Sequence, residues 1–264
     1  MDWVLVRYLV ISDIHANLEA LDATLAAAAG YDAGYEKVLM LGDLVGYGAD
    51  PNAVIDRVRE LPLAAVIRGN HDKVAAGIEG TDGFNLVART AVTWTATALT
   101  PANRAWLAAL PAGPLVIDDS IEICHGTPYD EDVYVFDDMD AFQAIRASTR
   151  PLCLYGHTHV PAVFRLIDGA APGDAHRDPS LDLLGPTGGP RFKVQMDADA
   201  RFLVNCGAVG QPRDGDSRAA YGIVDTDARL VTITRVEYDI PAAQKKILDA
   251  GLPDVLARRL AVGR

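Results

Sequence analysis

Short apolar runs alternate with stretches of helical spacing along the N-terminal part of the chain. Residues 4–11 are almost all β-branched or leucine, which predicts a buried strand, and residues 37–41 and 63–67 form similar runs. Leucines at helical spacing after Asn17, and valine and isoleucine positions after Pro51, predict a helix in each interval. This β-α-β-α-β order predicts a largely parallel sheet with right-handed crossovers.

The remaining sequence predicts a mixture of helices and strands. Residues 85–110 predict a helix in two pieces divided at Pro101, and helical character returns at residues 139–146 and from Pro241 onward. Apolar or alternating runs predict strands at residues 115–117, 121–124, 152–155, 163–167, 192–196, 201–205, 221–224 and 230–236. Residues 168–190 are rich in glycine, proline and aspartate and show no period, which predicts an excursion loop over the surface.

The composition limits the class of partner. Half of the 264 residues are hydrophobic, so the chain can bury a substantial core as one large domain or two small ones. The 24 basic residues against 36 acidic ones give a net charge of −12, and a surface of this sign repels a long nucleic acid. Bound divalent cations would reverse the field locally, so a small phosphorylated substrate remains compatible with this charge.

The cysteines and the hydropathy indicate the compartment. Cys124, Cys153 and Cys206 each lie in or at the end of an apolar run, and an odd number without paired spacing argues against a disulfide framework. No apolar stretch approaches the roughly 20 residues that a membrane span needs. The N-terminal run carries Arg7 and lacks a small-residue cleavage site before Asp13, so it does not resemble a signal peptide. We therefore expect a cytoplasmic protein that does not associate with membranes.

Residues of the metal-ligand type come directly after five of the predicted strands. Carboxylates, amides and imidazoles together suit Zn²⁺, Mn²⁺ or iron, and the ends of parallel strands gather at one edge of a sheet. Each residue alone has an ordinary explanation, such as a loop histidine, a turn aspartate or a helix cap. A shared metal site explains why five of the six histidines come after a strand and lie near a glycine, with only His176 elsewhere. The residues are Asp13, His15, Asp43, Asn70, His71, His125, His157 and His159.

The motifs that contain these residues, in chain order, resemble those of the calcineurin-like metallophosphoesterases. They are D-x-H at residue 13, G-D at 42, G-N-H-D at 69, H-G at 125 and G-H-T-H at 156. The resemblance covers residues 11 to about 213, and G-D-L-V-G-Y-G and G-x-V-G-Q-P-R-D resemble the small bacterial and archaeal phosphodiesterase branch. It implies a single domain over residues 1–264, built as a four-layer α/β/β/α sandwich of two mixed sheets.

The resemblance also implies a dinuclear centre of two divalent ions (Mn, Fe, Zn, Ni or Co) in which a metal-bound hydroxide attacks phosphorus. Asp43 would bridge the two ions, as the two oxygens of its carboxylate allow. His71 would protonate the leaving oxygen, with Asp72 holding its ring. The ligands of one ion would be Asp13, His15 and His159, and those of the other Asn70, His125 and His157, with Asn70 also close to the substrate.

One position departs from the family pattern. Many relatives carry an arginine that contacts the phosphate a few residues after the G-D aspartate, where this chain has Gly46, Tyr47 and Gly48. Arg213, in a late loop with Gln211, is a candidate substitute; the alternative is a surface arginine paired with Asp214 or Asp216. Two further candidate substrate contacts, each with an ordinary alternative as a turn tyrosine or an N-cap asparagine, are Tyr47 and Asn17.

Three functions remain open at this point. The first is hydrolysis of phosphomonoesters or small phosphodiesters, for which every expected ligand and the acid are present. The second is hydrolysis of a diadenosine polyphosphate, with the acidic and aromatic stretch 129–136 and the 168–190 loop shaping a nucleotide pocket. The third is a non-catalytic scaffold, which would be expected to lack ligands or the acid. The oligomeric state is not indicated by the sequence.

Overall fold

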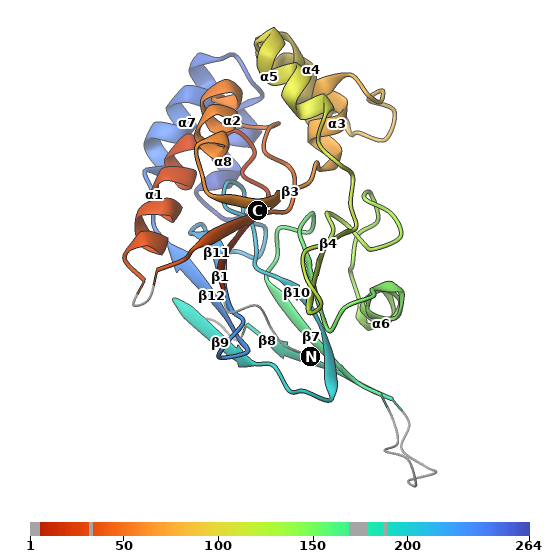
Figure 1. Cartoon of the computed structure of the whole chain (residues 1–264). Coiled ribbons are helices and arrows are strands. Elements are labelled where there is room, and N and C mark those ends of the chain that lie inside the picture. Colours follow the sequence, from red (N-terminus) through yellow and green to blue (C-terminus); the bar gives the residue numbers. More distant parts are fainter. Residues whose placement is uncertain (1–5, 32–33, 169–178, 187–188) are drawn as a thin grey trace, which may run out of the picture.

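The computed structural model describes residues 6–31, 34–168, 179–186 and 189–264 (Figure 1). Its helices are α1 (Leu18–Ala29), α2 (Pro51–Arg59), α3 (Asn70–Ala76), α4 (Leu86–Ala98), α5 (Pro101–Ala108), α6 (Asp138–Ala147), α7 (Ile240–Asp249) and α8 (Asp254–Leu260). Its strands are β1 (Arg7–Ile11), β2 (Lys37–Met40), β3 (Leu63–Val66), β4 (Leu115–Val116), β5 (Ile121–Ile123), β6 (Leu152–Tyr155), β7 (Ala162–Ile167), β8 (Ser180–Gly185), β9 (Arg191–Gln195), β10 (Ala200–Asn205), β11 (Ala219–Asp225) and β12 (Leu230–Val236).

These strands form two mixed six-stranded sheets. The first has the order β3-β2-β1-β11-β12-β9 and the second β4-β5-β6-β10-β7-β8. In the first sheet β1, β2 and β3 are parallel and β11 runs antiparallel to β1. In the second sheet β5, β6 and β10 are parallel and β7 runs antiparallel to β10. Each sheet therefore contains a parallel set of three strands whose carboxyl ends point the same way.

Side chains that alternate along the strands build three cores and four layers. In β1, Leu9 packs with the helices on the outer face of the first sheet, whereas Val10 packs between the two sheets. In β6, Leu154 joins the core between the sheets, while Tyr155 faces α6 on the outer side. Helix α1 lies against the first sheet and α6 against the second, which confirms the expected four-layer α/β/β/α sandwich (Figure 1).

The structure departs from the sequence expectations in several elements. Residues 180–185 form strand β8 at the edge of the second sheet, so the excursion predicted at 168–190 contains a regular element; residues 169–178 and 187–188, including His176, lie outside the described part. Strand β7, the next strand after β6 in the chain, pairs antiparallel with β10. The short helix α3 was not predicted, and the C-terminal helix is divided at Gly251.

Among the described residues, no helix combines the length and apolar character that crossing a bilayer requires.

Candidate metal centre

The first group of ligand atoms joins the ends of β1, β2 and β6. One donor atom each from Asp13, His15, Asp43 and His159 lies within 4.8 Å of the others, and all four residues are buried. Nε2 of His15 is 3.0 Å from Nε2 of His159 and 3.5 Å from Oδ2 of Asp43. Nε2 of His159 is 3.4 Å from Oδ1 of Asp13. This arrangement surrounds a space of the size that a metal ion fills.

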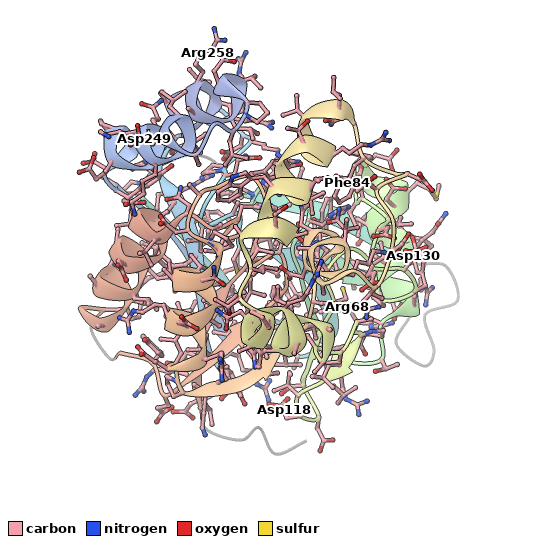
Figure 2. The ribbon with its side chains drawn as sticks, turned by 90° about the horizontal axis from the view of Figure 1, so that it is seen from above. Arg68, Phe84, Asp118, Asp130, Asp249 and Arg258 are labelled. Atoms are coloured by element: carbon pink, nitrogen blue, oxygen red, sulfur yellow. The ribbon has the colours of Figure 1, made fainter. Side chains whose placement is uncertain are left out.

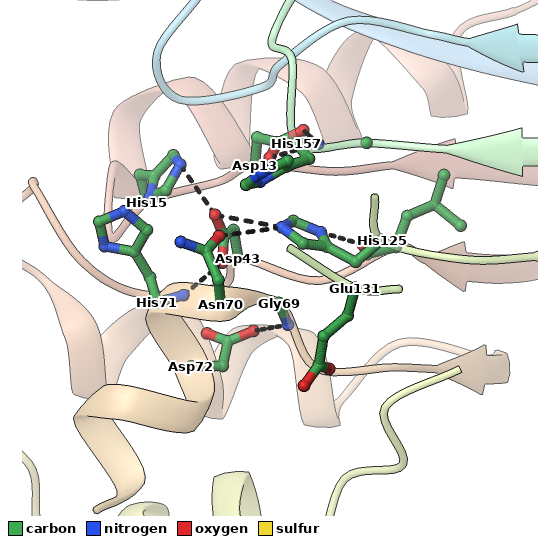
Figure 3. A network of polar contacts seen from close by, with 12 residues as sticks. Asp13, His15, Asp43, Gly69, Asn70, His71, Asp72, His125, Glu131 and His157 are labelled. Atoms are coloured by element: carbon green, nitrogen blue, oxygen red, sulfur yellow. Dashed lines mark hydrogen bonds and ion pairs between the residues drawn. The ribbon is translucent and has the colours of Figure 1, made fainter. Parts of the chain in front are cut away.

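The second group shares Asp43 with the first (Figure 3). Donor atoms of Asp43, His125 and His157 lie within 4.8 Å of one another. Nε2 of His125 is 3.4 Å from Oδ2 of Asp43 and 3.2 Å from Oδ1 of Asn70, so the Asn70 amide oxygen is also directed at this group. The structure thus brings together all seven residues predicted to bind metal, in the two sets that the resemblance implied, with Asp43 common to both.

Backbone carbonyl groups determine which ring nitrogen each histidine presents. Nδ1 of His15 lies 3.0 Å from the carbonyl oxygen of Val45. Nδ1 of His125 lies 2.8 Å from the carbonyl oxygen of Leu41, and Nδ1 of His159 lies 2.6 Å from that of Gln211. A carbonyl only accepts, so Nδ1 carries the proton and Nε2 presents a lone pair. In His157 the roles are reversed, because Nε2 donates to the carbonyl of Asp132 at 3.1 Å. Such hydrogen bonds from the remote ring nitrogen are typical of histidines that bind metal.

The backbone is strained at the ligands. Five of them have positive φ, a conformation uncommon for residues other than glycine: Asp13, His15, Asp43, His157 and His159. Hydrogen bonds between the loops hold this conformation, including Asp13 N–H to Gly42 O at 3.0 Å. A Cβ atom on Gly42 would come within 2.6 Å of the backbone nitrogen of Gly69, so only glycine lets the two ligand loops approach this closely.

Burial and neighbouring charges shift the titration of the ligands. Burial lowers the pKa of His15 and His159 and brings that of His157 to about 3, so these imidazoles are neutral and able to bind metal at pH 7. Burial raises the pKa of Asp13 to about 6. His125 differs: burial acts to lower its pKa, but the Asp43 carboxylate, the Asp13 carboxylate and the Leu41 carbonyl together outweigh burial and raise the pKa to about 10. Asp43 thus favours positive charge beside it, and the donor set fits two divalent cations. They would supply that charge and leave the lone pair on Nε2 of His125 free to bind one of them.

His71 lies beside the ligands without belonging to either group. It is 4% exposed and its backbone N–H donates to Oδ1 of Asp43 at 2.9 Å, whereas its Nδ1 has no hydrogen-bond partner among the described residues. Its ring packs against the rings of Tyr47 and Phe84, at centroid distances of 4.3 and 4.6 Å. Burial lowers its pKa to about 4. These side chains line a cavity of about 220 Å³ that Asn70 and His157 also border, on the side of the molecule that carries Phe84 in Figure 2.

Asp72 does not hold the ring of His71, contrary to the sequence expectation. Its buried carboxylate accepts hydrogen bonds from the backbone N–H groups of Leu44 at 3.2 Å, Val45 at 3.1 Å and Gly69 at 2.9 Å. Gly69, not Asn70, is the N-cap of α3, and Asp72 closes that cap. Asp72 therefore joins the loop after β2 to the start of α3, which positions Asp43 and His71 without touching the reacting atoms.

Arg213 extends over the site and is not a surface ion pair. Both acids considered as alternative partners are otherwise engaged: Asp214 with Arg235 and Asp216 with Arg218. The Arg213 guanidinium lies 5.7 Å from the Tyr47 ring centroid and donates to Oε1 of Gln211 at 3.0 Å. Within the part of the chain that the structure describes, its buried Nε has no hydrogen-bond partner. Arg213, Gln211 and Tyr47 thus lie together beside the ligand groups, with the Nε–H of Arg213 unpaired in the described part of the chain.

Asn17 is used by the fold. Its Oδ1 caps α1 by accepting from Ala20 N–H at 3.1 Å, and its Nδ2 donates to the carbonyl of Gly210 at 2.8 Å. The side chain is 5% exposed. These bonds tie the loop after β1 to the Arg213 loop, so the expected substrate contact is not supported and the N-cap interpretation is correct.

Two further residues beside the ligands were not identified from the sequence. Tyr134 stacks on the ring of His157, with centroids 3.7 Å apart, and borders the same cavity. Lys73, 5% exposed, reaches from α3 to the loop that carries Tyr134. The acidic and aromatic composition of residues 129–136 was a signal for Tyr134, but no sequence pattern indicates which aromatic ring of this stretch faces the ligands.

The comparisons with known proteins agree with this geometry. An uncharacterized protein of Methanocaldococcus jannaschii is 37% identical over 264 residues, covering 97% of each chain. The crystal structure of a metallophosphoesterase from Sphaerobacter thermophilus is 38% identical, with a TM-score of 0.80 over 98% of this chain and 99% of that one. A hypothetical protein from Pyrococcus horikoshii OT3 shares the fold, at 20% identity and a TM-score of 0.74, over 98% of this chain and 99% of that one.

The sequence profile described as "Calcineurin-like phosphoesterase superfamily domain" matches residues 6–229. From the ligand groups and these matches together, the chain belongs to the calcineurin-like phosphoesterase superfamily.

Proposed function

We propose that this protein is a dinuclear metal-dependent phosphoesterase that hydrolyses phosphomonoesters or small phosphodiesters. The observation that carries the proposal is the sharing of Asp43 between two buried ligand groups whose histidine tautomers are set by backbone carbonyls. A carboxylate common to two such groups is the arrangement of two-metal hydrolases. The family relationship supports the same reaction class.

The bound ions would activate a water molecule and neutralise the charge of the phosphoryl oxygens. Asp13, His15 and His159 would hold one ion, Asn70, His125 and His157 the other, and Asp43 both. Mn²⁺, Fe, Zn²⁺, Ni²⁺ and Co²⁺ all suit this mixture of imidazole, carboxylate and amide ligands.

The residues beside the ions have separate tasks in the proposal. His71 delivers a proton to the leaving oxygen; the negative charge of a bound phosphate favours the protonated imidazole, opposing the effect of burial. Arg213 donates its unpaired Nε–H to a phosphoryl oxygen and thereby replaces the arginine that the G-D loop lacks. Tyr47 supports the guanidinium through its ring face.

The direct test is hydrolysis of p-nitrophenyl phosphate and bis-p-nitrophenyl phosphate after loading with Mn²⁺, Ni²⁺, Co²⁺ or Zn²⁺. Turnover of either ester with at least one metal is expected, and the ratio of the two rates gives the preference for monoesters or diesters. A parallel assay with diadenosine tetraphosphate decides the nucleotide alternative. No turnover of any ester, together with fewer than two bound ions by elemental analysis, would favour the non-catalytic scaffold instead.

We further propose that the protein acts on a small phosphorylated substrate in the cytoplasm. The three cysteines are free and buried, and the Sγ atoms of Cys124 and Cys153 lie 3.7 Å apart without a disulfide. Thiols in this state suit a reducing compartment. Alkylation of the unfolded protein after isolation from cells without reductant would detect all three thiols if this is correct.

A further inference from the structure

Two ligands of the second ion, Asn70 and His157, are separated by 87 positions yet lie beside a common charged residue. Asn70 begins α3, and Lys73 lies in the last turn of the same short helix, where its backbone N–H bonds to Gly69 O at 3.1 Å. His157 is oriented by the loop of residues 130–134, through its Nε2 hydrogen bond to Asp132 O and through the ring of Tyr134. A residue that connects α3 to this loop therefore also connects the two ligands.

Lys73 makes that connection. Its ammonium lies 2.5 Å from Oδ2 of Asp132 and 3.4 Å from Oε1 of Glu131, and it also pairs with Glu79 at 2.7 Å. The lysine side chain is 6% exposed, whereas those of Asp132 and Glu79 are 47% and 58% exposed. The ammonium therefore lies beneath a group of carboxylates that would repel one another in its absence.

Besides its ion pairs with Lys73, the 130–134 loop makes one further ion pair and one close steric contact. Arg68 binds the Glu131 carboxylate through two nitrogens, at 3.1 and 3.2 Å, and Glu131 lies beside the first turn of α3 (Figure 3). A Cβ atom on Gly126 would come within 2.6 Å of Val133 O, so the loop packs closely on the residue after His125. Neither contact touches Asp132, whose carbonyl orients His157; the ion pair with Lys73 does.

From these contacts we infer that Lys73 is a positioning residue for the second metal ion: through Asp132 it sets the orientation of His157 relative to Asn70. This inference rests on the proposed dinuclear centre. It adds that the affinity for one of the two ions depends on a lysine that itself binds no metal. The first group has no such dependence, because His15 and His159 are oriented by the carbonyls of Val45 and Gln211. Loss of Lys73 should therefore weaken the binding of the second ion and leave the binding of the first ion unchanged.

The experiment is Mn²⁺ titration of the metal-free full chain by isothermal calorimetry, with the wild type compared with Lys73→Met and Asp132→Asn. Asp132→Asn keeps the backbone carbonyl but removes the carboxylate that Lys73 binds. In both variants we expect one ion to bind as in the wild type and the other to bind about 10- to 100-fold more weakly, the range seen when groups that orient metal ligands are removed.

Glu79→Gln is the matched control. It removes an ion pair of Lys73 of similar length and exposure, but on a segment that carries no metal ligand. Unchanged binding of both ions is expected. The role of Lys73 would be overturned if Lys73→Met bound both ions equally more weakly than the wild type. It would also be overturned if Glu79→Gln lost as much affinity for an ion as Asp132→Asn. Wild-type protein that binds fewer than two ions would instead count against the dinuclear centre itself, so the two failures are distinguishable. Circular dichroism of each variant checks that the chain is folded.

Discussion

Nε2 of His15 and Nε2 of His159 lie 3.0 Å apart in the interior, although 144 positions separate the residues along the chain. Each ring has its Nδ1 proton committed to a backbone carbonyl, so the two nitrogens face one another as lone pairs. Two such acceptors, with the carboxylates of Asp13 and Asp43 near them, repel one another unless a cation lies between them.

This relationship predicts that metal stabilises the folded chain. Removal of metal with EDTA should lower the melting temperature, and Mn²⁺ should restore it, because an ion that binds only the folded state adds about 2.7 kcal/mol at a concentration 100 times its dissociation constant. Differential scanning calorimetry with and without Mn²⁺ measures the shift. His159→Ala removes one of the facing nitrogens and should reduce the shift in melting temperature that Mn²⁺ causes. A shift as large in this variant as in the wild type would contradict the assignment of His159 as a metal ligand.

The second prediction concerns His71. His71→Ala should still bind two ions, since the ring is directed at neither ligand group, but its kcat should fall about 10²–10⁴-fold, the usual contribution of a positioned general acid. Elemental analysis and turnover of bis-p-nitrophenyl phosphate on the same preparation measure both quantities. A variant with full metal content and full activity would remove His71 from the mechanism.

Arg213 is the subject of the third prediction. Arg213→Gln should lower kcat/KM by about 10- to 150-fold, because a hydrogen bond to a charged group contributes about 1.5–3 kcal/mol. The matched control is Arg218→Gln, in the same part of the chain, whose guanidinium is already paired with Asp216. Near-equal kinetics for the two variants would mean that Arg213 does not contact the phosphate.

The fourth prediction tests the structural role of Asp72. Asp72→Ala leaves three buried backbone N–H groups without an acceptor, so the free energy of unfolding should fall by about 3 kcal/mol or more, at about 1–3 kcal/mol for each group. Asp72→Asn retains one acceptor oxygen and should lose less.

Urea denaturation in EDTA measures this effect without a contribution from metal. Asp56→Ala, on the exposed face of α2, is the control and should change stability by no more than about 0.5 kcal/mol. A loss for Asp72→Ala as small as that of Asp56→Ala would show that the bonds to Leu44, Val45 and Gly69 do not stabilise the fold.

The sequence by itself determined the family, the layered α/β architecture and the residues that form the candidate metal centre. It could do so because each ligand, such as Asp13 or His125, comes directly after an apolar strand and beside a glycine or a second ligand, and parallel strands bring the residues at their carboxyl ends to one edge of the sheet. Strand β8 was not predicted, because its six residues, SLDLLG, lie within a stretch that is otherwise rich in glycine, proline and aspartate.

Tertiary structure alone decided the tasks of the residues around the ligands. Asp72 adjoins His71 in the chain, yet its carboxylate turns to the backbone of another loop. Arg213 contacts Gln211 and Tyr47 beside the ligands, while Arg235 and Arg218 pair with the acids near it in the sequence. Lys73 connects two ligands because the 130–134 loop folds back over α3. Metal ligands can be recognised by residue type and spacing, whereas a supporting residue is defined by its partner, and that partner comes from a distant part of the chain.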